Sequence, residues 1–247
     1  MIHYDAGSEA NNQIFAESIQ PLNSLTYLNW SCNSLGIEGA WVLAEGIRRS
    51  PCLQHMDLKR NSLSSGGSGT FPLAAAIGTL TSLSHLNMSG NSGLGWDGLK
   101  QLSGAIAGLT GLRVLNIQEI GLGHHPDGGG ARFMAEAIRG LTSLQRLNMK
   151  ENGLGDNSGD LELFDAIQVC TQLQTLTLRE NSLGPAAATL IAVAVVGGLT
   201  RLRKLHVSRN RFGAAGVSRL ADAIKTIPYF RDIVDEGYQA LDLKYAT

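Results

Sequence analysis

A motif of leucine and asparagine recurs seven times along the 247-residue chain and constrains its fold more than any other feature. The first copy runs from Leu25 through Leu28, Trp30 and Asn33 to Leu35. The copies begin at residues 25, 53, 83, 112, 144, 173 and 202, so one copy takes 28 to 32 residues. A period of this length is typical of solenoids, in which one small unit stacks on the next.

Each copy has a second half in which two apolar residues stand four positions apart with small residues between them. In the first copy these are Leu43 and Ile47, and this spacing places both side chains on one face of an α-helix. The first half alternates apolar and polar residues, as a short strand does. Each copy is therefore predicted to form a strand, a turn and a helix. The insertions at 64–72, 123–132 and 155–160 all fall between strand and helix, on one edge of the solenoid.

These copies resemble the leucine-rich repeat, whose pattern is L-x-x-L-x-L-x-x-N-x-L, and the helix pattern L-A-x-A-I resembles its ribonuclease-inhibitor-like subfamily. The resemblance covers roughly residues 12–235. It implies an α/β fold: a right-handed solenoid, or horseshoe, with a parallel sheet on the concave face and helices on the convex face. It also implies that the asparagines bond to backbone groups of the turns. Ile120 stands at an asparagine position, so it should interrupt this ladder locally.

We expect a single leucine-rich-repeat domain over residues 1–247. Its parts are a partial first repeat at 12–24, seven full repeats at 25–229 and a degenerate C-terminal cap at 230–247. Phe230 and Ile233 begin an eighth strand within this cap. The ends of a solenoid core need covering, a role that we assign to the terminal segments of the chain. Coverage by a partner or by further sequence is the alternative.

Side chains between the core leucines of each strand point to the concave face of such a fold, and in the C-terminal half many of them are basic. The residues predicted to bind a protein partner are Arg146, Asn148, Lys150, Arg179, Lys204, His206, Arg209 and, near the strand-to-helix edge, Trp96. Arg203 belongs to the same basic group, which Glu151 and Glu180 oppose. Two interpretations stay open: a solvated face of charge pairs, each contributing little, or a site for an acidic protein surface.

The three tryptophans differ in what the repeat requires of them. Trp30 occupies a leucine position of the core, which predicts a packing role. Trp41 and Trp96 fall near the strand-to-helix edge, where the repeat needs no aromatic residue. Tryptophan is enriched in interface hot spots. Partial burial against the next repeat explains both positions equally well.

Signals for catalysis or metal binding are weak. The G-x-G-x-x-G at 93–98 follows a strand and precedes a helix, as in dinucleotide sites, but its glycines belong to the repeat consensus. His124, His125 and Asp127 stand in the longest insertion and have the chemistry of metal ligands. Adjacent histidines in a glycine-rich loop are usually only solvated. We therefore predict no enzyme, no cofactor and no metal site.

A second pair of histidines is predicted on the sheet. His55 and His85 occupy equivalent positions on adjacent strands, and Asp57 lies close by in the sequence. The pair is either an ordinary part of the solvated face or a pH-sensitive or metal-binding pair.

Charge and cysteine content limit the function classes. The 20 Lys and Arg residues against 21 Asp and Glu give a net charge of -1, which argues against nucleic-acid or membrane-surface binding driven by general charge. No run of 18 apolar residues predicts a membrane span. Cys32, Cys52 and Cys170 are odd in number and scattered. We therefore expect a reducing compartment and an intracellular, cytoplasmic location.

The sequence favours a non-catalytic scaffold that binds a protein partner through its concave face and its strand-to-helix loop edge. One alternative is a structural subunit of a large cytoskeletal or organellar assembly. Another is a relative of the activators of Ran GTPase, which the repeat length resembles. Those proteins carry an acidic tail after the repeats, whereas residues 241–247 here are not acidic.

Overall fold

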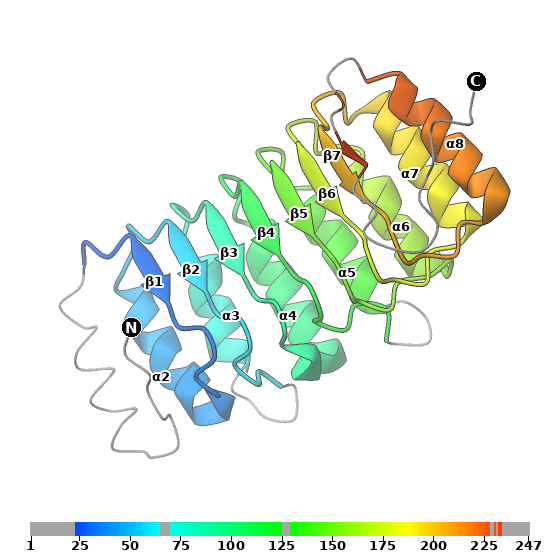
Figure 1. Ribbon diagram of the computed structural model, residues 1–247. Helices are drawn as coiled ribbons and strands as arrows, with labels where there is room; N and C mark the ends of the chain where they lie inside the picture. The colour runs from blue at the N-terminus through cyan, green and yellow to red at the C-terminus, as the bar shows by residue number, and fades with distance from the viewer. Residues whose placement is uncertain (1–22, 65–69, 125–128, 228–229, 231, 234–247) are drawn as a thin grey trace.

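The computed structural model describes residues 23–64, 70–124, 129–227, 230 and 232–233, and within them strands and helices alternate (Figure 1). The strands are β1 (Tyr27–Asn29), β2 (His55–Asp57), β3 (His85–Asn87), β4 (Val114–Asn116), β5 (Arg146–Asn148), β6 (Thr175–Thr177), β7 (Lys204–His206) and β8 (Asp232–Ile233). The helices are α2 (Gly36–Arg48), α3 (Thr70–Gly78), α4 (Gly95–Ala107), α5 (Gly129–Ile138), α6 (Ser158–Ile167), α7 (Pro185–Gly197) and α8 (Gly213–Lys225), with a short 3-10 helix, η1, at Ser92–Leu94.

The strands form one parallel sheet in chain order, from β1 to β8. Equivalent residues of successive repeats lie opposite each other in the register, for example Leu115 opposite Leu147 and Leu147 opposite Leu176. The sheet forms one layer of a curved solenoid and the helices form the other (Figure 1). The predicted α/β leucine-rich-repeat solenoid is therefore confirmed.

The termini are only partly described. The predicted partial repeat at 12–24 lies almost wholly outside the described residues, as does most of the predicted cap at 230–247. The eighth strand expected at Phe230 and Ile233 is present as β8, which pairs with β7.

The core lies between the two layers and is filled by the repeated leucines. Leu53, Leu83 and Leu112, which open three successive copies, are at most 1% exposed. The helix pair Leu43 and Ile47 is equally buried. Burial of each such side chain stabilises the fold by about 1.5–3 kcal/mol relative to exposure, so the strand and helix halves hold each other in place.

The asparagine ladder runs along the turns after the strands. The Oδ1 of Asn61 accepts a bond from the backbone N–H of Asn33 at 3.0 Å, and the N–H of Asn61 donates in turn to Asn91 Oδ1 at 3.0 Å. Ile120 stands at the next position and has no side-chain oxygen to accept the equivalent bond from the N–H of Asn91. It is fully buried. The ladder resumes at Asn152, whose Oδ1 accepts from the N–H of Ile120 at 3.1 Å. The predicted interruption is confirmed.

The insertion at 155–160 links two repeats. Asp156 accepts bonds from the backbone N–H groups of Gly184, Ala186 and Ala187 at 3.0–3.1 Å. These are the orphan donors at the N-terminus of α7, which starts with a glycine and a proline and has no capping side chain of its own. A carboxylate from one repeat therefore caps the helix of the next.

Candidate functional site

The residues predicted to bind a partner come from two different rows of the concave face. Arg146 and Lys204 stand at the starts of β5 and β7. Lys150, Arg179 and Arg209 follow the ends of β5, β6 and β7 instead. The two rows are therefore separated by the length of a strand, and their surroundings differ.

The backbone after each strand enters the left-handed region. Glu151, Glu180 and Arg209 have φ of 55°, 55° and 56°, and the equivalent residues Arg60 and Glu119 behave alike. The same turn recurs in each repeat, and neighbouring strands are about 4.8 Å apart. Long side chains on these turns are thus held within reach of one another.

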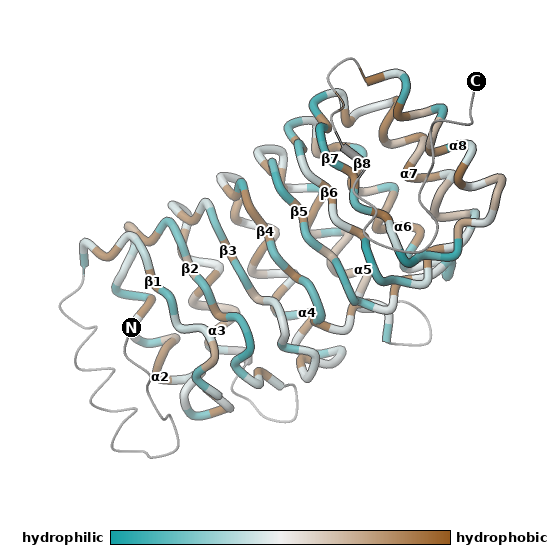
Figure 2. Tube along the Cα trace, in the orientation of Figure 1, coloured by the Kyte–Doolittle hydropathy of each residue, from teal (hydrophilic) through white to brown (hydrophobic). Residues whose placement is uncertain are grey.

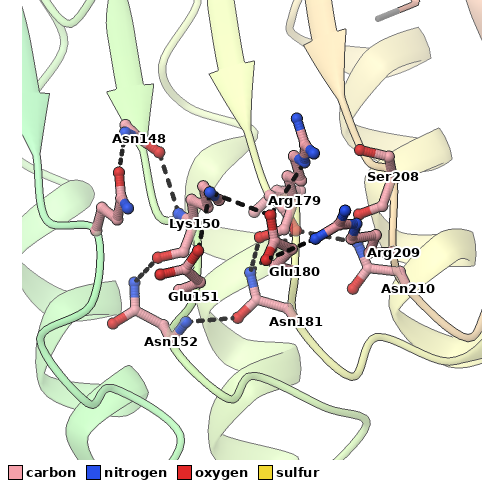
Figure 3. A network of polar contacts seen from close by, with 12 residues as sticks. Asn148, Lys150, Glu151, Asn152, Arg179, Glu180, Asn181, Ser208, Arg209 and Asn210 are labelled. Atoms are coloured by element: carbon pink, nitrogen blue, oxygen red, sulfur yellow. Dashed lines mark hydrogen bonds and ion pairs between the residues drawn. The ribbon is translucent and has the colours of Figure 1, made fainter. Parts of the chain in front are cut away.

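Glu180 is the centre of an ion-pair network at these turns (Figure 3). Its carboxylate lies 3.1 Å from Lys150 Nζ, 3.1 Å from Arg179 Nε and 3.2 Å from an Arg209 guanidinium nitrogen. Lys150 also pairs with Glu151 at 2.8 Å. We call these five residues the Glu180 network. Its three cations meet two carboxylates within the same cluster, so most of its charge is already neutralised.

The electrostatics of the Glu180 network agree with this pairing. Burial alone would raise the pKa of Glu180, but the hydrogen bond from Lys150 and the positive charges around the carboxyl outweigh it and lower the pKa. The hydrogen bonds to Glu151 and Glu180 raise the pKa of Lys150. Both groups stay charged at neutral pH, and the side chains of Lys150 and Glu180 are only 25% and 22% exposed.

Asn148 has a structural task that the sequence did not reveal. Its Oδ1 accepts a bond from the backbone N–H of Lys150 at 3.1 Å and so closes the turn after β5. Asn29, Asn87 and Asn116 make the same bond two residues ahead. An asparagine at this position thus closes the turn of its own repeat, and Asn148 does so for the turn that carries Lys150 and Glu151 of the Glu180 network.

A different set of cations lies at the opposite ends of the strands. We call Arg113, Arg146, Arg201 and Arg203 the arginine row. Arg113 and Arg203 immediately precede β4 and β7, and Arg201 lies two residues before Arg203. All four side chains are exposed, and none forms an ion pair with another residue that the structure describes. A hollow of about 270 Å³ beside Arg201 and Arg203 is also lined by Gln174 and Thr200.

The positive charge of the arginine row acts on the neighbouring His85. Burial lowers the pKa of His85 first, and the charges of His55, Arg146 and Arg113 lower it further. The rings of His55 and His85 are stacked, with centroids 4.1 Å apart. The arginines at the strand starts occupy two positions of the repeat, one held by Arg146 and the other by Arg113 and Arg203. In the repeats of β1 to β7, neither position holds an aspartate or a glutamate. This edge of the sheet is therefore positive.

Two predicted site residues have further contacts. Lys204 lies opposite Asp232 in the register of β7 and β8. His206 is half-buried at the end of β7. Both have interactions beyond the arginine row, so neither is counted among its members.

Trp96 lies apart from the other predicted site residues. It is the second residue of α4, in the helix layer, and is 41% exposed. Its ring meets Phe133 of α5 edge-on at 5.0 Å, and Lys100 Nζ lies 5.2 Å from its centroid. Trp41 is 50% exposed on α2, while Trp30 packs against the core as predicted. The structure thus joins Trp96 to the next repeat and not to the concave face.

The metal candidates gain no support from the described residues. In that part of the chain, no three histidine, cysteine, aspartate or glutamate side chains come together as metal ligands would. His125 and Asp127 of the predicted loop group lie outside it.

Comparison with known proteins matches one repeat. A family model described as a leucine-rich repeat matches residues 199–221, which begin just after α7 and extend through β7 into α8. No curated protein matches the chain. Leucine-rich repeats generally mediate protein–protein interaction and are typically non-catalytic. Among the helices of the described residues, none has the length and apolar character needed to cross a bilayer.

Proposed function

We propose that this leucine-rich-repeat solenoid is a non-catalytic interaction scaffold whose concave face, over β4 to β7, binds an acidic segment of a protein partner. The observation that carries the proposal is the arginine row. Its guanidinium groups are exposed and have no carboxylate partner among the described residues. A guanidinium binds a carboxylate through two parallel hydrogen bonds, so the row offers several strong contacts to an acidic chain.

The Glu180 network has a different part in this proposal. A partner that bound Lys150 or Arg179 would first have to displace Glu151 or Glu180, and that exchange yields little net free energy. We therefore assign the network the role of a rigid polar rim. The arginine row supplies the attraction, and Arg113 and Arg203, three strand spacings apart, cover about 14 Å of it.

An acidic protein segment fits this surface better than nucleic acid does. Proteins that bind single strands place aromatic rings between their basic groups so that bases can stack. The columns of β4 to β7 contain no aromatic ring between the arginines. The net charge of -1 also lacks the excess of positive charge typical of such proteins.

The test is a triple variant, Arg113→Gln, Arg146→Gln and Arg203→Gln, measured by fluorescence anisotropy with a synthetic glutamate-rich peptide. If each lost ion pair contributes about 0.5 kcal/mol, affinity should fall about tenfold. The matched control is Arg48→Gln, Arg49→Gln and Arg139→Gln on the helix layer, which should leave binding unchanged. Wild-type affinity should also fall as salt rises from about 50 to about 300 mM.

Three results would contradict the proposal. The first is an arginine-row variant that binds the peptide as tightly as the wild type does. The second is a helix-layer control that loses as much affinity as the arginine-row variant, and the third is a single-stranded RNA of equal charge that binds more tightly than the peptide. Affinity purification with the wild type and with the arginine-row variant then identifies the natural partner, which should be enriched only by the wild type.

Two further assignments belong to the same proposal. We place the repeats in the ribonuclease-inhibitor-like subfamily, which their length of 28 to 32 residues and their α-helical second halves support. We also place the protein in the cytoplasm. All three cysteines are free thiols, Cys32 and Cys52 exposed and Cys170 buried, as a reducing compartment requires.

A further inference from the structure

Two outward-facing positions recur on the helices of the solenoid, three residues apart. They hold Glu45 and Arg48 in α2, Glu136 in α5 with Arg139 just after its end, and Asp222 and Lys225 in α8, whereas in α3 and α4 they hold only alanine or glycine. In α7 the same two positions hold Val193 and Val196. The whole of α7 contains no charged residue, and in Figure 2 it lacks the strongly hydrophilic segments of α8.

The exposure of these two valines improves neither the helix stability nor the solubility of the isolated chain. Val193 is 50% exposed and Val196 is 58% exposed. Valine is a poorer helix former than the glutamate, lysine or arginine found at equivalent positions, by a few tenths of a kcal/mol. Neither helix formation nor solubility therefore favours valine here. Burial against another molecule does favour it, at about 25 cal/mol per Å² of apolar surface covered.

A groove lies beside the valines, between α7 and α8. Its volume is about 540 Å³, and Ala192, Val193 and Val196 form its α7 side. Arg219 and Asp222 of α8 line the other side. The same face thus presents both projecting apolar side chains and a hollow that can receive such side chains. A surface of this kind can complement itself.

We propose that this α7–α8 face binds a second copy of the chain about a two-fold axis. Val193 and Val196 of each copy enter the groove of the other, and Arg219 pairs with Asp222 of the partner subunit. The face belongs to the helices, whereas the arginine row lies where the strands begin; Figure 1 shows the helices and the strands as separate layers. The proposal therefore goes beyond the binding of an acidic segment and does not depend on it.

The charges that line the groove favour a second copy over other occupants. Arg219 and Asp222 are opposite in sign and one helical turn apart, so an antiparallel approach places each against its opposite. A membrane surface or an acidic partner would be matched by cations alone. The present contacts of both residues are local and exchangeable: Arg219 bonds to Thr189 Oγ1, and Asp222 pairs with Lys225 at 3.2 Å on the surface.

The first test measures self-association by sedimentation velocity from about 1 to about 200 µM, a range that detects micromolar dimers. The wild type should shift from monomer to dimer. The double variant Val193→Glu, Val196→Lys carries residue types found at these positions in other helices, so it should keep its fold and its melting temperature and stay monomeric. The charge swap Glu45→Lys, Arg48→Glu on α2 is the matched control and should dimerise as the wild type does.

The second test uses the charges. Arg219→Asp alone and Asp222→Arg alone should each weaken self-association at least tenfold, and an equimolar mixture of the two variants should form a heterodimer. The proposal is overturned by a wild type that is monomeric throughout, by a dimer that survives the valine variant, or by a mixture that fails to associate. A monomer whose α7–α8 face captures another protein would also overturn it and would point to a heterologous partner.

Discussion

The asparagine ladder makes a quantitative prediction at Asn152. This side chain is fully buried and connects two repeats across 30 to 35 residues of sequence. Its Oδ1 accepts bonds from the backbone N–H groups of Ile120 and Gly121, both at 3.1 Å. Its Nδ2 donates to the carbonyl of Ile117 at 2.8 Å. The substitution Asn152→Ala takes the hydrogen-bond partner away from these three backbone groups. They lie in the interior, where water cannot replace the lost bonds.

The expected loss follows from those three bonds. Each buried backbone group that loses its partner costs about 1–3 kcal/mol. The turn can relax to recover part of this, so the free energy of unfolding should fall by about 3–5 kcal/mol. Asn148→Ala provides the comparison, because Asn148 accepts one backbone bond at 3.1 Å at a half-buried site. That variant should lose only about 1 kcal/mol.

Urea denaturation followed by circular dichroism measures both variants at pH 7 and 25 °C. The midpoint of Asn152→Ala should move to lower urea while the slope of the transition stays that of the wild type. A loss below about 1 kcal/mol would refute the reasoning, since the buried bonds could not then hold the turns. Equal losses for Asn152→Ala and Asn148→Ala would refute it as well, because Asn152 is the more deeply buried of the two and loses more backbone bonds.

Three further predictions concern other parts of the described chain. Asp156→Ala removes the cap of α7 and should lower the free energy of unfolding by about 1 kcal/mol, whereas Asp165→Ala on the exposed face should not. The lowered pKa of Glu180 means that its stabilising effect is present above the ordinary value of 4.5 and is lost as the pH falls through the lower folded value. The difference in melting temperature between wild type and Glu180→Gln should therefore shrink in acid. Burial raises the pKa of Cys170 to about 12, so iodoacetamide at pH 8, read by mass spectrometry, should alkylate Cys32 and Cys52 and spare Cys170.

The fold was predictable because equivalent residues of successive repeats have the same surroundings. Once Leu28 and Leu43 are assigned to a strand and a helix, every later copy must place its equivalents in the same way. The effect of Ile120 was predictable for the same reason, since a missing amide at a fixed position has one consequence. Trp30 was placed in the core by the same reasoning, and the structure agrees.

The candidate site was predictable only in part, because side-chain pairing is not periodic. The sequence grouped Arg146, Lys150 and Arg179 together, but the structure divides them between a neutralised network and an unpaired edge. Arg113 was missed, although it stands at the same position of its repeat as Arg203. A comparison of equivalent positions, repeat by repeat, would have found it. The same comparison shows that, from α2 to α8, these two positions hold a pair of large apolar residues in α7 alone.

Dimerisation through the α7–α8 face would place two arginine rows in one particle and so strengthen the binding of a bivalent partner. A dimer joined at the α7–α8 faces would leave both arginine rows uncovered, because the rows lie where the strands begin and not on the helix faces. Such a dimer binds a partner with two acidic segments as a bivalent receptor, so its apparent affinity exceeds that of one row by far more than twofold. A valine variant that stays monomeric should then keep full affinity for a single acidic peptide and lose the gain for a tandem one. Tandem binding that is equally tight in monomer and dimer would separate the two surfaces functionally.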